Sequence, residues 1–162
     1  MLALAPLCVV WLCAGAALSV IDIREHRLPD RIVLPMYPVL AGVLALTGLL
    51  TGQWPLLRSL GGAGLWLAAI GSVWLMTSGR AMGFGDVKLA PLLGASLGWV
   101  SFDAALLGLM SCWILGGMWA LTLLATHRVS KRDAIAFGPF MFLGLLAGIA
   151  LGTSSGASAL GL

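Results

Sequence analysis

Two aspartates are the residues of this chain whose type and setting could support chemistry. Asp86 ends the motif Gly83-Phe84-Gly85-Asp86, and Asp22 directly follows a long apolar run. The chain holds six Asp and Glu residues in 162, and an ionisable residue at the edge of lipid suggests function because it is costly to place there. Two carboxylates a few ångströms apart share a proton, so that one can act as general base and the other as general acid. We therefore interpret Asp22 and Asp86 as a candidate catalytic pair.

The composition places these aspartates in a membrane protein. Hydrophobic residues make up 60% of the chain and charged residues 9%, whereas a soluble domain is roughly a quarter charged. The mean hydropathy is +1.06. We therefore predict an all-α integral membrane protein whose main partner is the lipid bilayer. The net charge of +3 is spread over short connections without a basic patch, which argues against a nucleic-acid partner.

Apolar runs divide the chain into candidate membrane helices. Crossing a hydrocarbon core of about 30 Å takes roughly 20 residues, and by this measure we expect about six transmembrane helices in one domain, residues 1–151. The expected helices cover residues 2–21, 32–50, 56–77, 86–100, 104–126 and 134–151. The first lacks a basic N-terminal region, so we interpret it as a retained helix and not a cleaved leader. Residues 152–162 are expected to form a short disordered tail.

The cysteines give no indication of a metal centre. Cys8, Cys13 and Cys112 all lie inside apolar runs, and none belongs to a CxxC pair. Small buried thiols are the simpler interpretation. Since two carboxylates can activate water by themselves, we expect neither a metal nor a cofactor.

The basic residues predict the orientation of the chain. Eight of the nine Lys and Arg residues belong to the odd-numbered connections or follow directly after them, and only Arg58 lies in an even-numbered one. The eight are Arg24, Arg27, Arg31, Arg80, Lys88, Arg128, Lys131 and Arg132. By the positive-inside rule the odd connections face the cytoplasm and both termini face away from it. Asp22 and Asp86 are then expected at the same membrane face.

The segment after Asp86 is short for a membrane helix. Residues 86–100 are fifteen residues, which cover only about 22 Å at 1.5 Å per residue. Either the helix starts before the motif or the membrane is thinned there. Gly83 and Gly85 are expected to form a turn that permits unusual backbone conformations and the close approach of another chain. Asp86 could also be a simple acidic residue at a helix N-terminus, and position alone does not decide between these interpretations.

Four short motifs in order carry a family resemblance. Ile21-Asp22-Ile23 and Leu28-Pro29-Asp30 come first, Gly83-Phe84-Gly85-Asp86-Val87-Lys88 follows, and Phe137-Gly138-Pro139-Phe140 is last. Together they resemble the prepilin peptidases, a family of GxGD aspartic membrane proteases. The resemblance implies a GxGD protease-type helical bundle in which Asp22 and Asp86 are catalytic. It further implies cleavage of a prepilin or pseudopilin precursor after the glycine that ends its short basic leader.

The resemblance also implies a cellular setting. The substrate would be cleaved on the cytoplasmic side of a bacterial or archaeal cytoplasmic membrane, and components of pilus or secretion assembly become candidate partners. Longer members of the family carry a cytoplasmic domain, often with two CxxC pairs, and also N-methylate the new N-terminus. Those features are missing from this sequence, which resembles the short, peptidase-only members. We therefore do not expect N-methyltransferase activity.

A helical substrate must unwind before water can reach its carbonyls, which suggests substrate-binding residues near the aspartates. Exposed backbone at Gly83, Phe84 and Gly85, with Lys88 just beyond, could pair with an extended substrate segment. Phe137, Gly138 and Pro139 are expected to form another wall of the site. A simple break or packing turn at the start of the sixth helix explains these three residues equally well.

Three other functions stay open at this point. A small proton-coupled carrier could use the two aspartates as relay sites, but it predicts acids near the bilayer midplane and repeated halves. A non-catalytic subunit of a pilus or secretion machine would keep the fold without needing both acids. Other GxGD intramembrane proteases resemble this chain less, because their first aspartate lies in a different motif.

Overall fold

A computed structural model describes residues 7, 9, 11–15, 18, 30–80, 82–126 and 137–159. Regular structure within these residues is helical throughout, which confirms the all-α prediction. The labelled helices are α2 (Asp30–Thr51), α3 (Leu56–Met76), α4 (Phe84–Val100), α5 (Phe102–Ala125) and α6 (Gly138–Ala159). The described residues between 7 and 18 are also helical. Three stretches, Ile32–Thr51, Leu56–Met76 and Phe102–Ala125, are long and apolar enough to cross a membrane.

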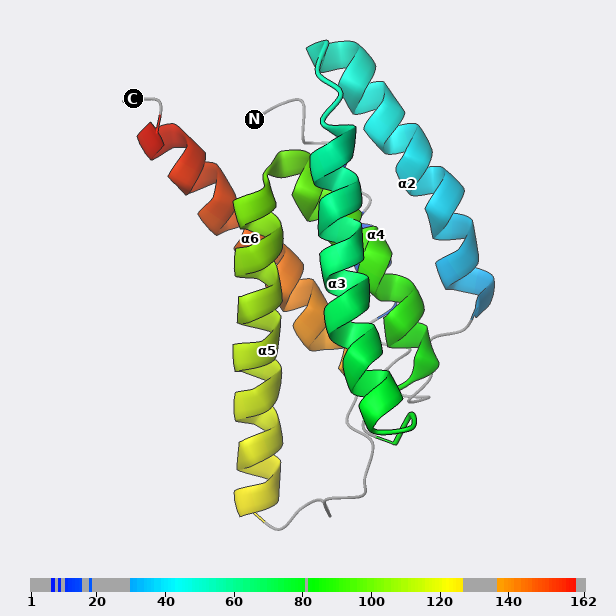
Figure 1. Ribbon diagram of the computed structural model, residues 1–162, viewed down its shortest axis with the longest axis vertical. Helices are drawn as coiled ribbons and strands as arrows, with labels where there is room; N and C mark the ends of the chain where they lie inside the picture. The colour runs from blue at the N-terminus through cyan, green and yellow to red at the C-terminus, as the bar shows by residue number, and fades with distance from the viewer. Residues whose placement is uncertain are drawn as a thin grey trace.

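Helix α4 is the centre of the bundle. It contacts α2, α3, α5 and α6, and Figure 1 shows it behind α3, with α2 on one side and α5 and α6 on the other. Eleven of its 17 residues are buried. The helix that carries Asp86 is therefore the one most enclosed by protein.

Glycines allow α3 and α4 to approach at backbone distance. A Cβ atom added at Gly62 would collide with the carbonyl oxygen of Gly94, and one added at Gly94 would collide with that of Gly62. Small residues at such crossings let membrane helices gain van der Waals contact, which drives their association in lipid. Ser59 adds a hydrogen bond across the same interface, from its Oγ atom to the carbonyl oxygen of Ala95 at 2.9 Å.

Two helix starts differ from those expected from the sequence. α4 begins at Phe84, two residues before the expected start at Asp86 but inside the motif, so the alternative of a helix that starts before the motif is wrong. Phe137 is not helical and α6 begins at Gly138, whereas a helix from residue 134 was expected. Pro139 explains this start, because a proline without an N–H suits the first turn of a helix.

The C-terminal stretch also differs from expectation. α6 continues to Ala159, so the part of the expected disordered tail between 152 and 159 is helical. Its composition of Gly, Ser, Thr and Ala led to the expectation of a tail, yet Ala and Ser are tolerated in helices and no proline interrupts the segment. The expected first helix, 2–21, lies largely outside the described residues.

Candidate functional site

Asp86 lies in the first turn of α4 and is buried. Its side chain is 3% exposed, and its Oδ1 atom is inaccessible to solvent. The backbone N–H of Asp86 donates to the carbonyl oxygen of Gly83 at 3.2 Å, which closes the first turn. A surface acid at a helix N-terminus would be exposed, so the burial of Asp86 favours the functional interpretation over simple capping.

The glycines of the motif have a different role from the one expected. Gly83 is the N-cap of α4 with φ −72° and ψ 152°, a conformation open to most residues, while Phe84 and Gly85 are helical. The expected turn with glycine-only conformations is therefore wrong. A Cβ atom added at Gly83 would lie 3.8 Å from Oδ2 of Asp86, an ordinary contact. Gly83 is exposed directly beside the buried carboxylate, which leaves the backbone there open to approach.

Asp86 faces the interior formed with α5. Cys112 of α5 is fully buried and lies close enough to Asp86 for their electrostatic interaction to matter. A Cβ atom added at Gly144 of α6 would approach the Cys112 Cβ atom to 2.7 Å. The carboxylate thus lies near the place where α4, α5 and α6 come together.

Phe84 and Lys88 form a separate cluster on another face of α4. The Phe84 ring is 51% exposed and its centroid lies 5.1 Å from that of Trp74 in α3. The Lys88 Nζ atom lies 4.9 Å from the Phe84 ring centroid, in range of a cation–π interaction. Residues four apart share a helix face whereas residues two apart do not, so Asp86 lies on a different face from this pair. The structure therefore brings Phe84 and Lys88 together at the surface.

Phe137 and Pro139 contact different parts of the protein, although only Gly138 separates them in the sequence. The Phe137 ring packs on α5, with its centroid 5.4 Å from that of Trp113 and its Cε2 atom 2.6 Å from where a Cβ atom on Gly116 would lie. Its carbonyl oxygen accepts the N–H groups of Phe140 and Met141 at 3.0 and 3.2 Å and so closes the start of α6. These contacts support the packing-turn interpretation of Phe137.

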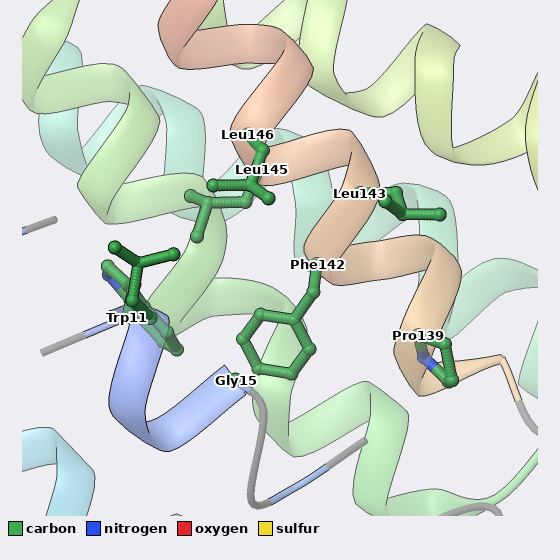
Figure 2. Close-up of a pocket in the computed structure, with 8 residues that line it drawn as sticks. Trp11, Gly15, Pro139, Phe142, Leu143, Leu145 and Leu146 are labelled. Atoms are coloured by element: carbon green, nitrogen blue, oxygen red, sulfur yellow. The ribbon is translucent and has the colours of Figure 1, made fainter. Parts of the chain in front are cut away.

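Pro139 instead lines a cavity of about 350 Å³ between α6 and the N-terminal helical segment. Figure 2 shows Trp11 and Gly15 on one wall and Pro139 and Phe142 along α6 on the other. The lining is almost entirely apolar. Hence Pro139 and Phe137, expected to form one wall, contribute to different surfaces.

Asp22 lies outside the described residues. The distance between Asp22 and Asp86 is therefore not described, and their pairing stays a prediction. The structure does describe a polar link between the segment that precedes Asp22 and the helix that carries Asp86. The Nε1 atom of buried Trp11 donates to the Oγ atom of buried Ser96 at 2.8 Å, and the Ser96 hydroxyl donates to the carbonyl oxygen of Leu92 at 2.8 Å.

The link between Trp11 and Ser96 was not predicted from the sequence. Tryptophan in a membrane protein is commonly assigned to the interfacial belt, and a serine inside an apolar run is commonly assigned to helix packing. A tryptophan in the middle of an apolar run is nevertheless informative, because its N–H needs a partner where no water is present. Among the described residues, no group of three or more His, Cys, Asp or Glu side chains could hold a metal ion.

Comparison with known proteins gives a consistent result. The model of the type IV leader peptidase family matches residues 7–155. The chain is 38% identical over 155 residues to the prepilin leader peptidase/N-methyltransferase of Dickeya chrysanthemi, covering 90% of this chain and 51% of that protein. The protein of the same name from Escherichia coli (strain K12) is 31% identical over 135 residues, covering 83% of this chain and 58% of its own length.

The chain thus spans about half the length of the curated relatives that it matches. The relative from Aeromonas salmonicida (strain A449) is 35% identical over 142 residues, which is 46% of that protein. No solved structure matches the chain.

Proposed function

The chain belongs to the type IV leader peptidase family, and from this premise we propose that it is an aspartic endopeptidase of the membrane. Its substrate is a prepilin or pseudopilin precursor, cut after the glycine that ends the short basic leader. The observation that carries the proposal is Asp86, a carboxylate that is 3% exposed at the start of the central helix and lies in the GxGD motif.

Asp22 is the proposed partner of Asp86, and helix register supports the pairing. In a chain that crosses the membrane with each helix, the first and fourth helices run in opposite directions. Asp22 follows Trp11 by eleven residues and Asp86 precedes Ser96 by ten, which corresponds to about 16 Å and about 15 Å along the respective helix axes. Because Trp11 and Ser96 are hydrogen bonded, the two aspartates are expected at nearly the same depth.

The proposed mechanism uses one ionised and one protonated aspartate. The ionised carboxylate accepts a proton from a water molecule as the water attacks the scissile carbonyl carbon. The protonated carboxyl group donates to the carbonyl oxygen, where negative charge develops. We assign the base role to Asp86, because the N–H groups at the start of α4 favour negative charge in the first turn. The protonated partner is then Asp22.

The expected setting is the cytoplasmic face of a bacterial or archaeal cytoplasmic membrane, with both termini on the opposite side. The distribution of eight basic residues against one supports this orientation. The proposed activity is the peptidase step; N-methyltransferase activity is named for the relatives, of which the chain spans about half. Mass spectrometry of the processed N-terminus distinguishes cleavage from cleavage followed by methylation.

The test is co-expression of the full chain with a prepilin precursor, with leader removal followed by gel shift and mass spectrometry. Asp86→Ala and Asp22→Ala should each lower cleavage by about a hundredfold or more, the usual scale for loss of a general acid or base. Asp103→Asn is the matched control, because Asp103 is an exposed acid in the first turn of α5. This variant should cleave the precursor like the wild-type protein. Cleavage that survives either alanine substitution contradicts the dyad.

A further inference from the structure

An apolar cleft of about 440 Å³ runs between α2 and α3, with α4 as its floor. Its walls include Leu40 and Leu44 of α2, Leu60 and Ala63 of α3, and Leu92 of α4. α2 contacts α4, and α3 contacts α4 far more extensively. Figure 1 shows α2 standing apart from α3 below their connecting loop. Leu60 is 68% exposed, so the cleft opens to the surrounding lipid.

The hydroxyl groups along the cleft are already used by the protein. The Tyr37 hydroxyl donates to the carbonyl oxygen of Lys88 at 2.8 Å. The Ser59 hydroxyl donates to the carbonyl oxygen of Ala95 at 2.9 Å. A ligand inside the cleft therefore meets aliphatic and aromatic side chains and no hydroxyl that needs a partner. Hydrocarbon suits such a surface, whereas a polar ligand would lose its hydrogen bonds to water without replacement.

The cleft is too small to enclose a transmembrane helix. One turn of an α-helix about 10 Å wide and 5.4 Å long fills roughly 420 Å³. The cleft of about 440 Å³ would hold only a single turn. A single hydrocarbon chain is narrower and longer, and therefore matches an elongated space between two helices.

A second, more open hollow continues the cleft at its end near the α2–α3 connection. The hollow is lined by residues 53–58 and shares Trp54 and Leu56 with the cleft. It contains the side chains of Gln53 and Arg58. The Trp54 ring packs edge-on against that of Trp99, with centroids 6.4 Å apart, at the junction of the two spaces. Tryptophans concentrate at the level of lipid headgroups, and a guanidinium group binds phosphate through paired N–H donors.

We propose that this combined space is a binding site for one phospholipid. One acyl chain lies in the cleft between α2 and α3, and the phosphate is bound at Arg58 beside Gln53. The lipid then fills the space that separates α2 from α3 and supports the position of α2 against α4. This proposal is independent of the proposed peptidase activity, because binding requires neither aspartate.

The test uses the full chain in phosphatidylcholine vesicles that contain a small fraction of phosphatidylglycerol with a photoactivatable acyl chain. After illumination, labelled peptides are mapped by mass spectrometry. Labelling should concentrate on cleft alanines such as Ala41, Ala45 and Ala63 over Ala68, an exposed residue outside the cleft. Even labelling of all lipid-exposed residues in the wild-type protein would overturn the proposal.

Variants test the two ends of the site separately. Ala63→Phe fills the cleft and should lower cleft labelling about tenfold, which corresponds to roughly 1.4 kcal/mol. Ala68→Phe adds the same group to α3 outside the cleft and should leave labelling unchanged. Arg58→Gln should lower labelling severalfold, whereas Arg80→Gln, beyond the other end of α3, should not. Equal labelling in Arg58→Gln and Arg80→Gln would overturn the phosphate contact, and circular dichroism of each variant identifies a failure to fold.

Discussion

Trp11 and Ser96 join the N-terminal helical segment to the central helix through a buried hydrogen bond of 2.8 Å. The two residues are 85 positions apart in the sequence and both are almost fully buried. The Ser96 hydroxyl donates in turn to its own helix, at the carbonyl oxygen of Leu92. This polar contact, together with the packing of Trp11 on Phe142, holds the N-terminal segment at a defined depth against the central helix.

Ser96→Ala should destabilise the protein by about 1–3 kcal/mol, because it leaves the Trp11 N–H buried without an acceptor. Trp11→Phe/Ser96→Ala should lose less than the sum of the single changes, since neither group then needs a partner. Thermal unfolding in detergent measures both effects. Ser72→Ala is the control, because Ser72 is exposed and bonds only within α3. Additive effects of the two single changes would contradict the coupling.

Gly62→Ala should lower stability by about 1–3 kcal/mol through forced separation of α3 and α4. The added methyl group has no space, because it meets the backbone of Gly94. Since α4 carries Asp86, leader cleavage should fall as well. Gly64→Ala is the matched control on the same helix, because a Cβ atom there meets no other atom within 4 Å. Equal stability of the two variants, measured by thermal unfolding, would show that the close approach contributes little.

Gly116→Ala should displace the Phe137 ring, because the added Cβ atom would lie 2.6 Å from it. If Phe137 shapes the substrate site, Gly116→Ala should raise KM for the prepilin. Gly117→Ala is the neighbouring control and should cleave like the wild-type protein, since Gly117 has open space around it. A kinetic assay with purified precursor separates KM from kcat. Lower stability with unchanged kinetics would assign Phe137 to packing alone.

Phe84→Ala should have little effect on the stability of the protein but should lower the cleavage of the precursor. The ring is half exposed, and its contacts with Trp74 and Lys88 are worth about 1 kcal/mol each at the surface. A substrate contact predicts a severalfold lower kcat/KM, measured with the same precursor. Phe102→Ala removes a similarly exposed ring at the start of α5 and serves as control. Wild-type kcat/KM in Phe84→Ala would remove Phe84 from the substrate site.

Local patterns predicted the helices well where a proline, glycine or charge interrupts an apolar run. α3 was expected over 56–77 and is Leu56–Met76. The pattern failed at the two ends of α6, where Pro139 delays the start and a stretch of small residues continues the helix. Such ends depend on backbone hydrogen bonds, which hydropathy does not describe.

The candidate site was predictable only in part. The motif identified Asp86, and its burial supports that choice. The same motif suggested that Phe84, Lys88 and Asp86 act together, whereas α4 turns the first two toward the surface and Asp86 toward the interior. On a helix, residues four apart share a face and residues two apart do not. This rule applies to the motif only because α4 begins inside it, at Phe84.

By itself the sequence determined that this is a helical membrane protein with its rare acids beside apolar helices, because a backbone in lipid must satisfy its own hydrogen bonds. Only the tertiary structure decided that α4 is the enclosed helix, that Trp11 meets Ser96, and that a cleft separates α2 from α3. The reason is physical. Lipid tails are as apolar as leucine, so residues that face lipid and residues that face protein look alike in the sequence, and close packing alone distinguishes them.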